Sequence, residues 1–305
     1  MPCRQLYRRL LSAVVAGALV SGGALAQTSA RSEWTAATAV TGVYQFDADL
    51  EGGGDFGWGA LIASGALIRQ VTPQFGAGLA LRYDYEKWNF SQAAAFGGQA
   101  PWDRLNMLSV SLPVDFAFAR DFRVGITPLF GWSYETGAGG SNARNYGAVL
   151  AATKRFSPQL TLGAGAGIFR QIDETKVFPF LVVQWQINER WRLANPFRAG
   201  PAGGAGLELA YAVDDNWEVA GGGAYRSSRF RLDDNGLAPG GIGEHRFFPL
   251  FARVARKWGP GTTLELYAGV SAGGRLSVTD TNGDDVASED YDPALAVGLT
   301  LSHRF

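Results

Sequence analysis

FGAGLALRYDY, residues 75–85, alternates between two kinds of side chain. Every second residue from Ala77 to Tyr85 is apolar or aromatic, and the residues between them are Gly, Ala, Arg82 and Asp84. Successive side chains of a β-strand point to opposite faces, so this segment has one face suited to lipid and one suited to water. It predicts a strand that separates an apolar environment from an aqueous one.

The same alternation recurs along the chain, in segments of similar length. We expect about 14 strands by this pattern, or 12 if the weak segment near Trp191 is not a strand. The expected strands are 35–48, 56–70, 75–88, 105–119, 122–134, 146–156, 160–171, 177–187, 190–196, 204–213, 217–231, 246–257, 262–274 and 292–305.

The connections between these segments are alternately short and long. Tight turns such as 71–74 and 214–216 contain Pro, Asp and Asn, and between them lie longer Gly-rich or acidic loops such as 91–103 and 279–290. Both chain ends fall on the side of the short turns. This arrangement is typical of up-and-down outer-membrane barrels, with periplasmic turns and extracellular loops.

The composition agrees with a barrel. The 305 residues include 41 Gly, 9 Trp, 10 Tyr and 19 Phe, with 18% charged residues and one cysteine, Cys3. After the first 30 residues no segment is long and apolar enough for a transmembrane helix, so a membrane would have to be crossed by strands. We therefore predict an all-β, transmembrane, antiparallel up-and-down barrel. A secreted β-sandwich is the alternative.

The N-terminal residues predict export. Arg4, Arg8 and Arg9 precede the apolar stretch 10–20, and a small-residue cleavage site follows at 24–26. We expect residues 1–26 to be a cleaved signal peptide and 27–305 to form a barrel in the bacterial outer membrane. The net charge of −1 gives no reason to expect nucleic acid as a partner.

The last residues alternate in the same way. Phe305 follows Leu301, Leu299 and Val297 at alternate positions, and this ending resembles the assembly signal of bacterial outer-membrane barrels. His303 departs from that pattern, in which an apolar or aromatic residue is usual. The resemblance implies that the barrel insertion machinery reads the C-terminal strand.

A second resemblance covers residues 191–232. It rests on Asn195, Pro196, the Gly-rich loop that follows, the strand 207–211 and the ending Arg-Phe-Arg at 229–231. The stretch resembles a segment shared by a family of bacterial outer-membrane barrel proteins with no assigned function. The resemblance implies a fold and no activity.

The sequence matches no template of a barrel enzyme. Such enzymes need a histidine placed as a base beside a nucleophile or a water molecule. The chain has two histidines; we expect His303 near the periplasmic end of the last strand and His245 at the base of a loop. We predict that the protein is not an enzyme and carries no cofactor.

Asp280, Asn282 and Asp284 match the first ligand positions of a calcium-binding loop. Asp285 stands where such a loop needs Gly, and Tyr291 where it needs Glu. We therefore expect a solvated acidic turn and no metal site.

The polar register of the strands supplies the candidate functional residues. Their charges are mixed in sign and separated by small residues, so they predict either an internal network of ion pairs or the lining of a water-filled passage. The lumen-lining candidates are Arg82, Asp84, Glu86, Asp115, Arg123, Gln184, Gln186, Glu208, Glu218, Arg226, Arg253, Glu265 and Arg275.

Two functions remain open. A barrel of about 14 strands is wider than one that side chains simply fill, which favours a passive pore or small-solute transporter. The alternative is a closed structural or surface barrel whose loops serve adhesion or contact with lipopolysaccharide. The expected partners are outer-membrane lipid, lipopolysaccharide, the insertion machinery and small solutes.

Overall fold

The computed structural model describes residues 34–196 and 200–305, so the predicted signal peptide, 1–26, lies outside the described residues. The strands are β1 (Trp34–Asp49), β2 (Asp55–Thr72), β3 (Phe75–Ser91), β4 (Arg104–Ser111), β5 (Val114–Ala117), β6 (Phe122–Glu135), β7 (Arg144–Arg155), β8 (Leu160–Gln171), β9 (Glu174–Gln186), β10 (Trp191–Ala194), β11 (Gly206–Ala212), β12 (Trp217–Ala224), β13 (Arg226–Arg231), β14 (Ile242–Trp258), β15 (Thr262–Thr279), β16 (Asp285–Tyr291) and β17 (Ala294–Arg304). Two short 3₁₀ helices, η3 (Ala94–Phe96) and η4 (Gly140–Asn142), lie in loops.

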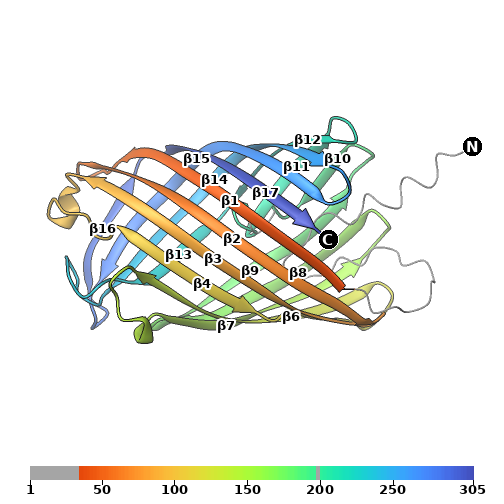
Figure 1. Ribbon diagram of the computed structural model, residues 1–305, viewed down its shortest axis with the longest axis horizontal. Coiled ribbons are helices and arrows are strands. Elements are labelled where there is room, and N and C mark those ends of the chain that lie inside the picture. Colours follow the sequence, from red (N-terminus) through yellow and green to blue (C-terminus); the bar gives the residue numbers. More distant parts are fainter. Residues whose placement is uncertain (1–33, 197–199) are drawn as a thin grey trace, which may run out of the picture.

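The strands form a closed antiparallel barrel (Figure 1). The segments β5, β13 and β17 continue β4, β12 and β16, so the barrel has 14 strands, as predicted. The weak segment near Trp191 is one of them, β10. The last strand closes the barrel by pairing with the first: Val40 pairs with Leu301, and the Phe305 N–H donates to the Ala36 carbonyl at 2.9 Å.

The outer face is apolar. Leu61, Leu81, Leu266 and Leu299 are 55%, 50%, 56% and 46% exposed, and each alternates with a residue that faces the interior. Large exposed apolar side chains around a barrel form the belt that contacts lipid. Separately, no helix in the described residues is both long and apolar enough to cross a membrane.

The strands at the extracellular end run further than the sequence indicates. The range 279–290 is expected as a long acidic loop, but β15 extends to Thr279 and residues 285–290 form most of β16, with a turn at 280–284 between them. The Asp280 carboxylate accepts the N–H groups of Asn282 at 2.8 Å and Asp284 at 2.9 Å, which lowers its pKa. The acidic side chain therefore serves the turn.

Candidate functional site

Along the barrel axis, the half of the interior nearer the extracellular end contains a cluster of packed aromatic side chains. Phe56, Trp58 and Trp88 of β2 and β3 face Phe230 of β13 across the lumen, and all are at most 2% exposed. Trp102, from the loop between β3 and β4, lies between them, with ring centroids 5.5 Å from Trp88 and 5.0 Å from Phe230. Such close packing leaves no path for a solute beside β1–β3.

His245 belongs to this aromatic cluster. The expectation that it lies at the base of a loop is corrected: it is a buried residue of β14, and its Nε2 lies 2.7 Å from the Tyr291 hydroxyl. Its ring is 5.0 Å from that of Trp88. The strand begins before it because Ile242 to Arg246 pair with both β13 and β15.

A network of charges occupies the periplasmic half. The Arg253 guanidinium lies at the centre: Nε donates to Glu208 at 3.0 Å, Nη1 to Glu265 at 2.9 Å and Nη2 to Glu218 at 2.7 Å. Arg192 of β10 also donates to Glu218, at 3.0 Å. One arginine thus ties three acidic residues of three different strands, and the charges compensate each other where water is scarce.

Other candidates form smaller pairs on the inner wall. Arg82 is paired with Asp84 on β3 at 2.7 Å, and Arg123 with Asp115 at 2.8 Å. Glu86 accepts from the indole N–H of Trp88 at 3.1 Å.

Gln184 and Gln186 lie on the inner register of β9, where the Gln186 amide donates to turn carbonyls. Arg275 is the exception among the candidates, and its placement in the lumen is corrected. The register of β14 against β15 shifts between Arg246 and Phe248, which turns Leu276 inward and Arg275 outward, toward Asp290.

Pro201, in the connection that leads into β11, lies inside the lumen. Pro201 lies against the inner wall at Gly298 of β17, where a Cβ would stand 2.6 Å from Pro201 Cγ. The Arg226 guanidinium donates to the Pro201 carbonyl at 2.6 Å and lies 5.7 Å from the ring centre of Phe247. Arg226, a predicted lumen residue, therefore holds this loop beside the aromatic cluster.

The inner face of β7–β9 is partly exposed at some positions, although Ala151, Thr153, Gly167 and Val182 on the same face are buried. Val149, Gly163, Gly165, Phe178 and Phe180 face the interior and retain solvent exposure. The rings lie flat on the wall: a Cβ on Gly165 would meet Phe180 Cζ at 2.5 Å, so the ring covers the glycine. Rings placed in this way narrow the lumen little. In the described residues the aromatic cluster is therefore fully buried, whereas parts of the inner face of β7–β9 keep solvent exposure.

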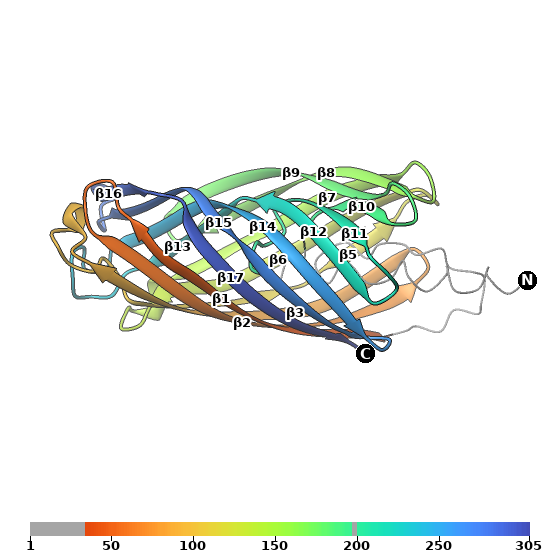
Figure 2. The same cartoon turned by 90° about the horizontal axis from the view of Figure 1, so that it is seen from above.

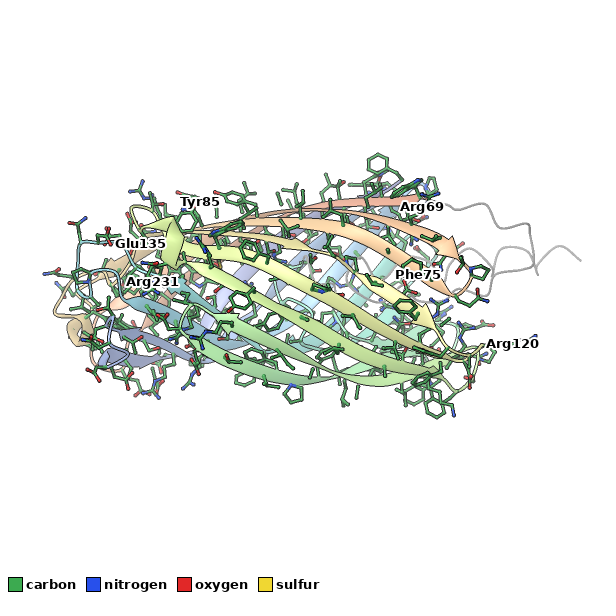
Figure 3. All side chains as sticks on the ribbon, turned by 90° about the horizontal axis from the view of Figure 1, so that it is seen from below. Arg69, Phe75, Tyr85, Arg120, Glu135 and Arg231 are labelled. Carbon is green, nitrogen blue, oxygen red and sulfur yellow. The ribbon has the colours of Figure 1, made fainter. Side chains whose placement is uncertain are left out.

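The extracellular end is crossed by β13 and the loop after it. Arg231 donates to the carbonyl of Asn142 in η4 at 3.1 Å and to Asp173, in the turn between β8 and β9, at 3.0 Å. Glu135, the last residue of β6, accepts the N–H groups of Asp103 at 2.9 Å and Asp233 at 3.0 Å. Burial raises the pKa of Glu135 to about 7. Figure 3 shows Glu135 and Arg231 together, far from Arg69 and Arg120 at the other end.

Residues 143–238 match a family described as a domain of unknown function (DUF6268). This segment contains the stretch 191–232, so the resemblance to a barrel family of unknown function is confirmed. Asn195 of that stretch joins neighbouring strands: its amide accepts from Val183 N–H at 2.9 Å and donates to the Leu181 and Gly206 carbonyls at 3.0 and 2.8 Å.

No curated protein matches the chain. Among solved structures, it is similar to a COG4313 outer membrane channel from Pseudomonas putida F1, with 10% identity over 90% of this chain and 96% of that chain and a TM-score of 0.49. It is also similar to the toluene transporter TodX of P. putida (10% identity, 90% and 91% coverage, TM-score 0.45) and to the translocator domain of the autotransporter NalP from Neisseria meningitidis (9%, 88% and 88%, 0.37).

Two groups of residues were missed by the sequence analysis. Phe56, Trp58 and Trp88 of the inner register alternate with outward residues. On β3, Trp88 follows Asp84 and Glu86, so the change from acid to aromatic along that strand was a usable signal. The partly buried Lys176, Arg229 and Glu244 fall in segments expected as strand ends or loops, and only the structure brings them together.

Proposed function

We propose that the protein is an outer-membrane channel for small solutes, whose path follows the inner face of β7–β9. One observation carries this proposal: Val149, Phe178 and Phe180 on the inner face of these strands keep partial exposure, whereas Ile62 and the aromatic cluster on the opposite side are at most a few per cent exposed. A solute that crosses this barrel would therefore pass along the wall formed by β7–β9.

The outer surface supports a location in a membrane. Its apolar belt includes the residues of the proposed assembly signal, because Val297, Leu299, Leu301 and Phe305 are 44%, 46%, 48% and 74% exposed on the last strand. Under this proposal the C-terminal strand is read by the insertion machinery, and lipid and lipopolysaccharide surround the barrel.

Transport fits the interior better than catalysis. His245 is engaged with Tyr291, and His303 Nδ1 lies 2.8 Å from the Thr262 hydroxyl. A closed structural barrel is the second candidate, favoured by the filled aromatic half and by the Arg253 network. A closed barrel would bury the whole inner face of β7–β9, whereas Val149, Phe178 and Phe180 on that face are partly exposed.

Conductance across a planar bilayer tests the proposal. Purified protein, shown to be folded by heat-modifiable gel mobility, is expected to give steady, small openings with reproducible ion selectivity. Folded protein that never conducts would favour the closed barrel.

A further inference from the structure

Among the residues that the structure describes, the backbone ladder of the wall is interrupted beside the proposed path. The short strand β10 pairs with β9 only at Gln184, Trp185 and Gln186, and β11 pairs with β12 only up to Ala224. Above these points, no described strand lies between the edge of β9 at 174–181 and the edge of β13. We call this junction the β9–β13 seam. Figure 2 shows β10 and β11 confined to the end of the barrel that carries the C-terminus.

The edge of β9 has the chemistry of an unpaired edge. The backbone of Val183 and of Leu181 points toward this side, because both bond to the Asn195 amide. Along a strand, the backbone N–H and C=O groups of every second residue point to the same side. The backbone of residue 179 therefore points to this side as well, and that residue is Pro179. Proline has no N–H, and within sheets it is confined to edges or bulges. At position 179 the chain therefore places no donor on an edge that has no described partner strand.

Side-chain charges join the two edges at their extracellular end. Lys176 Nζ of β9 lies 2.8 Å from Glu244 of β14, and Arg229 of β13 lies 3.3 Å from Glu174 of β9 and 3.2 Å from Glu244. Elsewhere in the wall, neighbouring strands are joined by backbone ladders. Partly exposed ion pairs are far weaker than such a ladder, so this is the junction that can separate.

Below the ion pairs, β9 is apolar on both faces. Val177 and Leu181 are 59% and 63% exposed on the outside, and the rings of Phe178 and Phe180 face the interior. An apolar solute can follow such an edge without meeting a charge. Meanwhile β13 and its loop cross the extracellular mouth, where Arg231 reaches Asp173. Access from the side avoids this obstruction.

We propose that the β9–β13 seam is a side portal through which small apolar or amphipathic molecules pass between the outer leaflet and the lumen. The proposal rests on the proposed channel function and assigns its substrate class and point of entry. Ions and small polar solutes would instead pass among the charged side chains of the mouth.

Locking the seam tests the portal. In a chain whose single native cysteine is Cys3, Lys176→Cys and Glu244→Cys are joined by a thiol-cleavable linker that spans the length of the two replaced side chains. The control pair, Tyr146→Cys with Arg170→Cys, joins β7 and β8, which are already fully paired. The probe is N-phenyl-1-naphthylamine, an apolar dye that fluoresces on entering membranes, added to Gram-negative cells that carry the protein.

Dye entry is expected to fall to the rate of cells without the protein when the seam is locked, and to recover when the linker is cleaved. The control link is expected to leave dye entry unchanged, and ion conductance in bilayers is expected to persist in both linked variants. Unchanged dye entry through a fully linked seam would overturn the portal and leave the channel standing. Wild-type protein that neither conducts nor speeds dye entry would instead overturn the channel itself, and the portal with it.

Discussion

Pro201, from the loop between β10 and β11, lies against Gly298 on the facing wall of the lumen, so closely that a Cβ on Gly298 would stand 2.6 Å from Pro201 Cγ. This contact lets the loop reach across the interior, because only a residue without a side chain leaves the space that the proline ring fills. The loop is held from the other side by Arg226, which donates to the Pro201 carbonyl.

Gly298→Val is therefore expected to displace the loop and lower the free energy of unfolding by about 1–3 kcal/mol, the usual cost of overpacking. Urea titration of the folded barrel, followed by tryptophan fluorescence, measures the change. Gly42→Val is the matched control, because nothing lies within 4 Å of a Cβ at Gly42 on the neighbouring strand. Equal losses in the two variants would contradict the contact.

Arg253→Met is expected to destabilise the barrel by about 3–5 kcal/mol, because it leaves Glu208, Glu218 and Glu265 without their shared countercharge. The same titration measures it, and adding Glu208→Gln is expected to restore part of the loss. Arg256→Met, which removes an outward charge from the same strand, is expected to cost about 1 kcal/mol or less through its contacts with Trp217 and Trp258. An Arg253 variant as stable as the Arg256 variant would show that the network contributes little.

Glu135 predicts a pH dependence at the extracellular end. Burial raises its pKa from 4.5 to about 7, so between these values the folded protein binds more protons than the unfolded chain. This contribution to stability is fully present below pH 4.5 and is lost as the pH rises through about 7. The urea midpoint is expected to fall over this range, and Glu135→Gln to flatten the fall. Glu189→Gln, in a periplasmic turn, is the control. If the urea midpoint of Glu135→Gln falls with pH as steeply as that of the wild type, or if Glu189→Gln flattens the fall equally, the pH dependence belongs to other groups.

Much of the fold could be predicted because a lipid-facing strand leaves a period of two in the sequence. The alternation at 75–85 and the closing residues Leu299 and Leu301 gave strands, faces and the strand number. The predicted ends of strands were wrong where the strands extend out of the membrane. There both faces of β15 and β16 contact water or protein, so the alternation of apolar and polar residues is absent at 279–290.

The interior was less predictable. The alternation of apolar and polar residues predicts that Arg253 and Glu265 face inward. Their contact with Glu208 depends on the register and shear of the strands between them, which the alternation does not fix. A register shift near Arg246 reversed the face of Arg275, and no local residue pattern announces such a shift. The inward loop at Pro201 depends on a glycine nearly a hundred positions away.

The central claim is that the interior is accessible on one side and sealed on the other. Val149→Cys, Ile62→Cys and Leu150→Cys test it in single channels exposed to a small charged methanethiosulfonate reagent. Val149 faces the accessible wall, Ile62 is a 1% exposed inward residue of β2, and Leu150 faces lipid. The account predicts that the reagent reduces the current only through the Val149 variant. Block of the Ile62 variant with the Val149 variant unaffected would contradict it and place the path on the opposite wall.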